Sequence, residues 1–115
     1  MTALVPAPEG FHMLRRLVLD AVSSRITRQM YGKALDDFFA WWEGHGRPPF
    51  TRAAVHAHRV ALEEKGYAPS TVNQRLAAIR KLAREAAANG WLPSEAAIGI
   101  AQVSGAKQQG TRARN

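Results

Sequence analysis

Residues 66–90 read GYAPSTVNQRLAAIRKLAREAAANG, and this stretch decides the fold. Pro69 and Ser70 follow a glycine and are typical of a helix start, whereas Asn89 and Gly90 are typical of a helix end. Apolar residues recur between them at helical spacing, which predicts one buried stripe along a long helix. This stripe consists of Val72, Leu76, Ile79, Ala83 and Ala86.

The opposite face of this helix is polar and basic, and it holds Ser70, Gln74, Lys81 and Arg84 around the small Ala77 and Ala78. At 100° per residue, Ser70, Gln74 and Lys81 lie within about 40° of one another. Such a face suits the major groove of B-DNA, where a glutamine can pair with adenine and small side chains let the backbone approach. Alanine is also the best helix former, so a merely solvated face explains the same pattern.

Four more helices are expected, over about residues 10–22, 24–43, 52–65 and 93–98, and no segment alternates as a strand does. Ser23 or Ser24 is expected to cap the second helix and Thr51 the third. The first helix should bury Phe11, Leu14, Val18 and Ala21. The fold class is therefore an all-α bundle of four to five helices. Its expected centre consists of Leu35, Phe38, Trp42, Leu76, Ile79 and Trp91.

Positive charge is concentrated in the C-terminal half of the chain. Residues 1–65 carry nine basic and seven acidic side chains, a net of +2, whereas residues 66–115 carry seven and two, a net of +5. This asymmetry points to a polyanionic partner, either nucleic acid or an anionic membrane surface.

No constellation for catalysis or metal binding is present. His56 and His58 are two positions apart on a helix, so they point in nearly opposite directions and cannot share a metal. Asp36 and Asp37 are expected on a solvated face. There are no cysteines, no phosphate-binding glycine loop, no signal peptide and no membrane-spanning run. We therefore expect no cofactor, no metal, no membrane association and a cytoplasmic, nucleoid-associated protein.

The start of the second helix supplies a second basic surface, because no acidic residue precedes Asp36 in it. Gln29 and Lys33 should face outward together. Arg28 lies near the edge of the apolar stripe, so it should reach either a phosphate or a neighbouring helix. Two helices with polar N-terminal halves are suited to grip one groove from two directions.

These elements resemble the core-binding domain of the tyrosine recombinases, the phage integrase and Xer-type enzymes. A Thr-x-x-x-Tyr element and an aromatic-rich helix end are matched by Thr27, Tyr31, Phe38 and Trp42. An element that begins the later helix is matched by Gly66, Ala68, Pro69, Thr71, Val72, Leu76, Ile79 and Arg80. The resemblance covers residue 23 to the end, and its 66–84 part is the most specific.

The resemblance implies a small orthogonal SAM-like bundle that binds double-stranded DNA and works with other recombinase protomers. It divides the chain into an N-terminal segment with the first helix (1–22), a core-binding domain (23–104) and a basic linker (105–115) toward a catalytic domain that is absent here. The isolated chain should then be monomeric and bind DNA without cutting it. The implied DNA-binding residues are Thr27, Arg28, Gln29, Met30, Lys33, Ser70, Thr71, Asn73, Gln74, Arg75, Lys81 and Arg84. Arg75 and Arg84 rank lower, as phosphate contacts at the edge of the groove.

Two other functions fit the same sequence. EEKGYAPSTVNQRL, residues 63–76, resembles helix, glycine turn and recognition helix, as in a helix-turn-helix regulator. A helical protein-interaction module is the second, with Trp41 beside Trp42 as its candidate apolar patch.

Overall fold

The computed structural model describes residues 8–105, which form five helices and no strand, so the all-α prediction is confirmed. These are α1 (Pro8–Asp20), α2 (Arg25–Gly44), α3 (Arg52–Glu64), α4 (Pro69–Ala88) and α5 (Ser94–Ala101). None of the helices in this range is both long and apolar enough to cross a lipid bilayer. Residues 106–115 of the expected basic linker lie outside the described residues.

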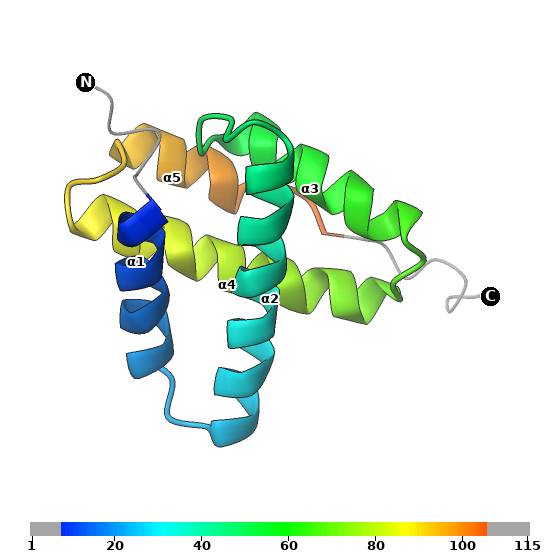
Figure 1. Cartoon of the computed structure of the whole chain (residues 1–115), viewed down its shortest axis with the longest axis horizontal. Helices are drawn as coiled ribbons and strands as arrows, with labels where there is room; N and C mark the ends of the chain where they lie inside the picture. Colours follow the sequence, from blue (N-terminus) through cyan, green and yellow to red (C-terminus); the bar gives the residue numbers. More distant parts are fainter. Residues whose placement is uncertain (1–7, 106–115) are drawn as a thin grey trace.

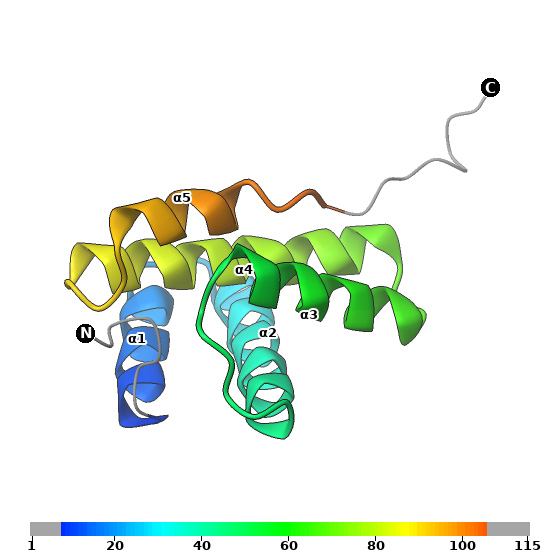
Figure 2. The same cartoon turned by 90° about the horizontal axis from the view of Figure 1, so that it is seen from above.

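Helix α4 is the centre of the bundle, because it packs against each of the four other helices. The helices α1 and α2 run antiparallel and cross α4 steeply, so that their connecting loop lies beyond α4 (Figure 1). Seen from above, α5 lies on the opposite side of α4 from α1 and α2, whereas α3 runs beside the N-terminal half of α4 (Figure 2). Helix α4 is thus packed from several directions.

The core is built around aromatic side chains from α1 and α2. Phe11 meets Trp42 edge to face, with 4.4 Å between ring centroids, and the Trp42 indole N–H donates to the Pro48 carbonyl at 2.7 Å. This bond satisfies the one polar atom that Trp42 brings into the core. Because Phe11, Leu14 and Val18 belong to the same buried cluster as α4, the first helix is part of the packed unit.

The helices begin and end at the serine, threonine and glycine residues that the sequence analysis identified. Ser24 caps α2, and its hydroxyl accepts from the Thr27 N–H at 3.3 Å. Gly66 and Gly90 follow α3 and α4 with φ of +88° and +77°, values that glycine adopts without strain. Thr51 occupies the N-cap position of α3, but its hydroxyl accepts no capping hydrogen bond. Thr51 is therefore the N-cap residue of α3, as predicted, but it does not cap the helix through its side chain.

Three predictions of burial are also wrong. Ala21 lies just beyond α1 and is exposed, and Trp91 is only partly buried at the edge of the core. Ala78 was expected on the outer face of α4 but is fully buried. Its burial follows from the central place of α4, whose buried residues span an arc of about 160° rather than a narrow stripe.

A candidate nucleic-acid interface

The N-terminal half of α2 extends past α4 (Figure 1). Most of its exposed side chains are polar, although the apolar Ile26 is exposed there as well. Gln29 and Lys33 are exposed there, as predicted, whereas Thr27 and Met30 are partly buried. The Ser24 cap fixes the start of this helix and therefore the direction in which these side chains point.

The exposed line of α4 begins at its first turn. Ser70, Gln74 and Arg84 are exposed, and Thr71 and Lys81 are partly buried. At 100° per residue, Ser70, Gln74, Lys81 and Arg84 fall within about 80° of one another, so they form one line along the helix. Among residues 8–105, neither lysine nor arginine of this line takes part in an ion pair.

The two polar surfaces meet at a corner between the helices. A small hollow of about 90 Å³ is lined by Met30 and Lys33 from α2 and by Thr71, Gln74 and Arg75 from α4. These residues lie far apart in the sequence, and the crossing of α2 over α4 brings them together. We define the α2–α4 surface by nine residues, of which five are exposed and four are partly buried. The exposed ones are Gln29, Lys33, Ser70, Gln74 and Arg84, and the partly buried ones are Thr27, Met30, Thr71 and Lys81.

The C-terminal part of this surface borders the end of the first helix. Lys81 and Arg84 line a second small hollow with Val18, Ala21 and Glu85. Glu85 is the acidic neighbour of these two cations on α4. The positive charge of Lys81 and Arg84 is therefore partly offset by Glu85, whereas no carboxylate lines the hollow that contains Lys33.

Arg75 does not lie at the edge of this surface, and its expected exposure is wrong. The residue is only 8 % exposed, its guanidinium is paired with the Asp37 carboxylate, and its Cζ lies 5.1 Å from the centre of the Tyr67 ring. It closes the floor of the hollow from inside the bundle. Asp36 is exposed, as expected, and its carboxylate accepts from Arg15 at 2.9 Å. Asp37 departs from the expected solvated face, because it is partly buried and paired with Arg75.

Arg28 contacts the protein's own backbone and is not part of the α2–α4 surface. Its guanidinium donates to the carbonyls of Leu19 at 3.1 Å and Val22 at 3.0 Å, at the end of α1. Of the two alternatives from the sequence, the neighbouring helix is therefore the one observed. These bonds tie the start of α2 to the end of α1 and to the loop that follows it.

Asn73 lies on a flank of α4 that is covered by the chain after α5. It is partly buried, and a Cβ on Gly105 would collide with its side-chain oxygen. Arg80 on the same flank donates to the Val103 carbonyl at 2.7 Å. Asn73 and Arg80 therefore face the segment that leaves the bundle, not the α2–α4 surface.

The sequence did not reveal a buried histidine on α3. His58 is 2 % exposed, and neither of its ring nitrogens has a hydrogen-bond partner among residues 8–105. Burial, followed by the nearby Arg75 charge, lowers the pKa of His58 from 6.5 to about 4. Its spacing from Val55 and Leu62, three and four positions, matches the buried face of α3 and was the signal that could have found it. His56 is exposed, so the two histidines do point apart.

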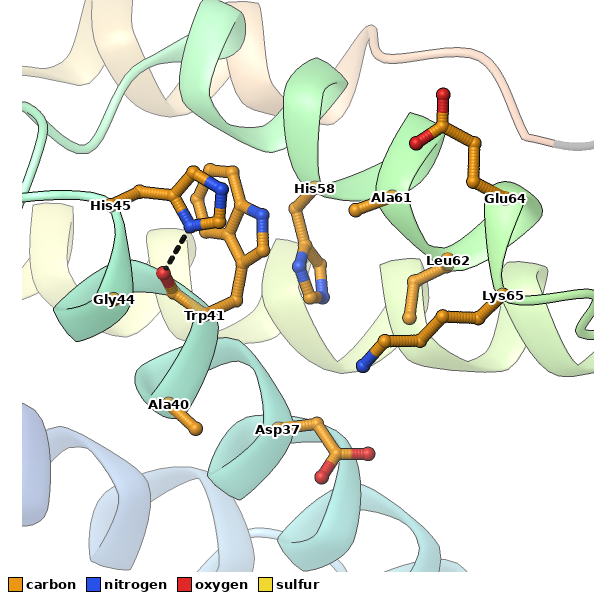
Figure 3. A pocket seen from close by; sticks show the side chains of 10 residues that line it. All are labelled: Asp37, Ala40, Trp41, Gly44, His45, His58, Ala61, Leu62, Glu64 and Lys65. Atoms are coloured by element: carbon orange, nitrogen blue, oxygen red, sulfur yellow. Dashed lines mark hydrogen bonds between the residues drawn. The ribbon is translucent and has the colours of Figure 1, made fainter.

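His58 lines a cavity of about 490 Å³ between the C-terminal half of α2 and α3 (Figure 3). Trp41, the candidate apolar patch, lies in its wall and is partly buried. No group of three or more potential metal ligands occurs within the described part of the chain.

Comparison with known proteins identified the family. Searches of curated proteins and of solved structures found no match. A family model described as "Phage integrase, N-terminal SAM-like domain" matches residues 13–90, which is more than half of the chain. This range contains α2, α3 and α4 whole, and with them every residue of the α2–α4 surface. The chain therefore belongs to the family of phage integrase N-terminal SAM-like domains.

Proposed function

We propose that this chain is the DNA-binding domain of a site-specific tyrosine recombinase and that it holds duplex DNA with the α2–α4 surface. Gln29 and Gln74 are suited to reach base edges in the major groove, and Lys33, Lys81 and Arg84 to contact phosphates. Breaking and rejoining of strands then belongs to another part of the recombinase. Other protomers and chromosomal DNA in the cytoplasm are the corresponding partners.

One observation carries this proposal. Polar faces that the sequence predicts on two separate helices border the same hollow, with Lys33 on one side and Gln74 on the other. A helix pair of this kind can contact one groove from two directions, whereas two faces pointing apart could not. The family match supports the proposal independently of this geometry.

The first test is fluorescence anisotropy of a labelled duplex titrated with the protein at several salt concentrations. We expect Kd values of about 10⁻⁴–10⁻⁶ M for non-specific DNA and a steep loss of affinity as salt rises, because bound cations of the DNA are released. Absence of binding at low salt, or binding that does not respond to salt, would contradict the proposal.

The second test assigns the surface. Lys33→Ala should weaken binding to all duplexes and reduce the slope of log K against log salt by about one. Arg52→Ala is the matched control, because Arg52 is an exposed cation on α3 with no ion pair in residues 8–105. Equal losses in the two variants would show that binding depends on net charge rather than on this surface.

The participation of α2 separates this proposal from a helix-turn-helix regulator, which would read DNA through α4 after the Gly66 turn. Gln29→Ala should change affinity or base preference if α2 enters the groove. Sedimentation of the free protein gives a second criterion, since a regulator of that class binds spaced half-sites as a two-fold dimer. A stable dimer that ignores Gln29→Ala would favour the regulator.

A further inference from the structure

The corner hollow of the α2–α4 surface lies where α2 crosses α4, and it is large enough for one methyl group (Figure 1). Its volume of about 90 Å³ exceeds the share of one molecule in liquid water, which is about 30 Å³. It is well below the range of about 300–1,000 Å³ that is usual for small-molecule sites. A methyl group is close to a water molecule in size, so it can enter the hollow with part of the base edge that carries it.

Two side chains give the hollow its apolar wall. Met30 from α2 and Thr71 from α4 are both partly buried there, and the wall is mostly apolar. The unbranched methionine side chain adapts to irregular shapes. Threonine offers its γ-methyl group, and such apolar atoms are the partners that the methyl group of thymine finds in the major groove of DNA.

The floor of the hollow is electrically neutralised. Arg75 forms this floor, but its guanidinium is paired with the Asp37 carboxylate and faces the Tyr67 ring. A phosphate is bound best by a cation that has no such partner. Lys33, the other cation of the lining, is exposed, so its ammonium group can reach a phosphate outside the hollow. The floor therefore favours an uncharged group of the DNA.

Gln74 relates the hollow to the edge of a base pair. Its side chain is exposed and belongs to the same lining. A glutamine can pair with N6 and N7 of adenine, and the thymine of an A·T pair presents its C5-methyl group in the same groove. An adenine bound to Gln74 can thus bring the thymine methyl group of the same or the next base pair to Met30 and Thr71.

We propose that this hollow is a thymine-methyl pocket, in which Met30 and Thr71 contact the C5-methyl group of one thymine in the major groove. The inference rests on the proposed function, because it requires duplex DNA on the α2–α4 surface. It makes Met30 and Thr71 residues that determine base preference, which contacts to phosphates do not supply.

The test compares duplexes that differ only in methyl groups. A preferred short duplex is first selected from a random-sequence pool. Each thymine in it is then replaced singly by uracil, which pairs as thymine does but lacks the methyl group. We expect one of these replacements to raise the Kd, measured by fluorescence anisotropy, by about two- to fourfold, which is the size expected when one buried methyl contact is lost.

Substitutions on both helices assign this effect to the hollow. Met30→Ala should abolish the difference between thymine and uracil, whereas Met13→Ala, at an exposed methionine of α1 outside the lining, should keep it. Thr71→Ser removes the γ-methyl group and keeps the hydroxyl, so it should reduce the difference. Thr71→Val keeps a methyl group and should preserve it. Circular dichroism checks that each variant is folded.

Failure of this inference is distinguishable from failure of the proposed function. Salt-dependent binding with no selectable sequence, or with Kd values that no uracil replacement changes, would overturn the methyl pocket and leave the DNA-binding proposal standing. A uracil effect that persists in Met30→Ala would place the methyl contact elsewhere and would likewise overturn it. Absence of binding at low salt would contradict both proposals.

Discussion

Arg75 shows why a residue type and its place in the sequence do not decide its role. It is an arginine on a basic helix, next to Gln74, which is exposed, yet it is buried against Asp37 and Tyr67. One step along a helix turns a side chain by about 100°, and on a helix packed from several directions that step crosses from solvent to interior. The same rotation separates exposed His56 from buried His58 after two steps.

We predict that Arg75→Met destabilises the protein, because it leaves the Asp37 carboxylate without its partner. The loss should be about 1–2 kcal/mol, below the usual cost of breaking a buried pair, since the Asp37 side chain is 38 % exposed and solvent replaces part of the interaction. Urea unfolding followed by circular dichroism measures this. Lys33→Met is the control and should change the unfolding free energy by less than about 0.5 kcal/mol.

The lowered pKa of His58 predicts that the free energy of unfolding decreases in mild acid. Its pKa of about 4 in the folded state is below the unfolded value of 6.5, so between these values the unfolded chain binds more protons and protonation favours unfolding. The neighbouring charges that act on it come from Arg75, Asp37, Lys65 and His45.

The unfolding free energy should therefore be constant above pH 6.5 and decrease from there to pH 4, by up to about 3 kcal/mol. The measurement is urea unfolding at intervals between pH 7.5 and 4. His58→Gln should flatten this dependence, whereas His56→Gln, the exposed neighbour, should keep it. A dependence that survives in His58→Gln would assign it to other groups.

At the scale of the helix, the boundaries were predictable and the buried faces only partly so. Glycine, proline or serine occurs at each junction between helices. Gly66 and Gly90 adopt positive φ after α3 and α4, and Ser24 caps α2. The apolar stripe of α4 was also correct. Ala78 and Arg75 were not predictable, because periodicity measures one preferred face and cannot tell how many neighbours a helix has.

The two capping positions give a matched prediction for helix ends. Ser24→Ala removes the hydroxyl that accepts from the Thr27 N–H and should lower stability by about 1 kcal/mol. Thr51→Ala should cost only a few tenths, because Thr51 accepts no capping bond at α3. Thermal unfolding of the two variants beside the unaltered protein distinguishes them, and equal losses would contradict the assignment.

For the whole molecule, the sequence predicted the fold class and most side chains of the α2–α4 surface. It did not predict that Arg28, Asn73 and Arg75 contact the protein itself, and it missed the cavity between α2 and α3. The surface was predictable because each helix exposes the side opposite its own apolar stripe. The cavity depends on how Trp41 and His58 approach each other from different helices, and no local pattern records that distance.

The central position of α4 predicts a single cooperative unfolding transition. Leu76→Ala should destabilise by about 2–5 kcal/mol, because Leu76 is buried in the helix that all others contact. Helical signal by circular dichroism and tryptophan fluorescence should change together in urea, for the unaltered protein and for the variant. Separate midpoints for the two signals would show that α1 or α5 detaches before the rest.

The Asp37–Arg75 pair has one end in each of the two hollows: Asp37 lines the α2–α3 cavity and Arg75 lines the corner beside Gln74. A change that draws Asp37 away from Arg75 should therefore also alter the lining of the hollow beside Gln74. The Asp37–Arg75 ion pair therefore connects the two hollows physically.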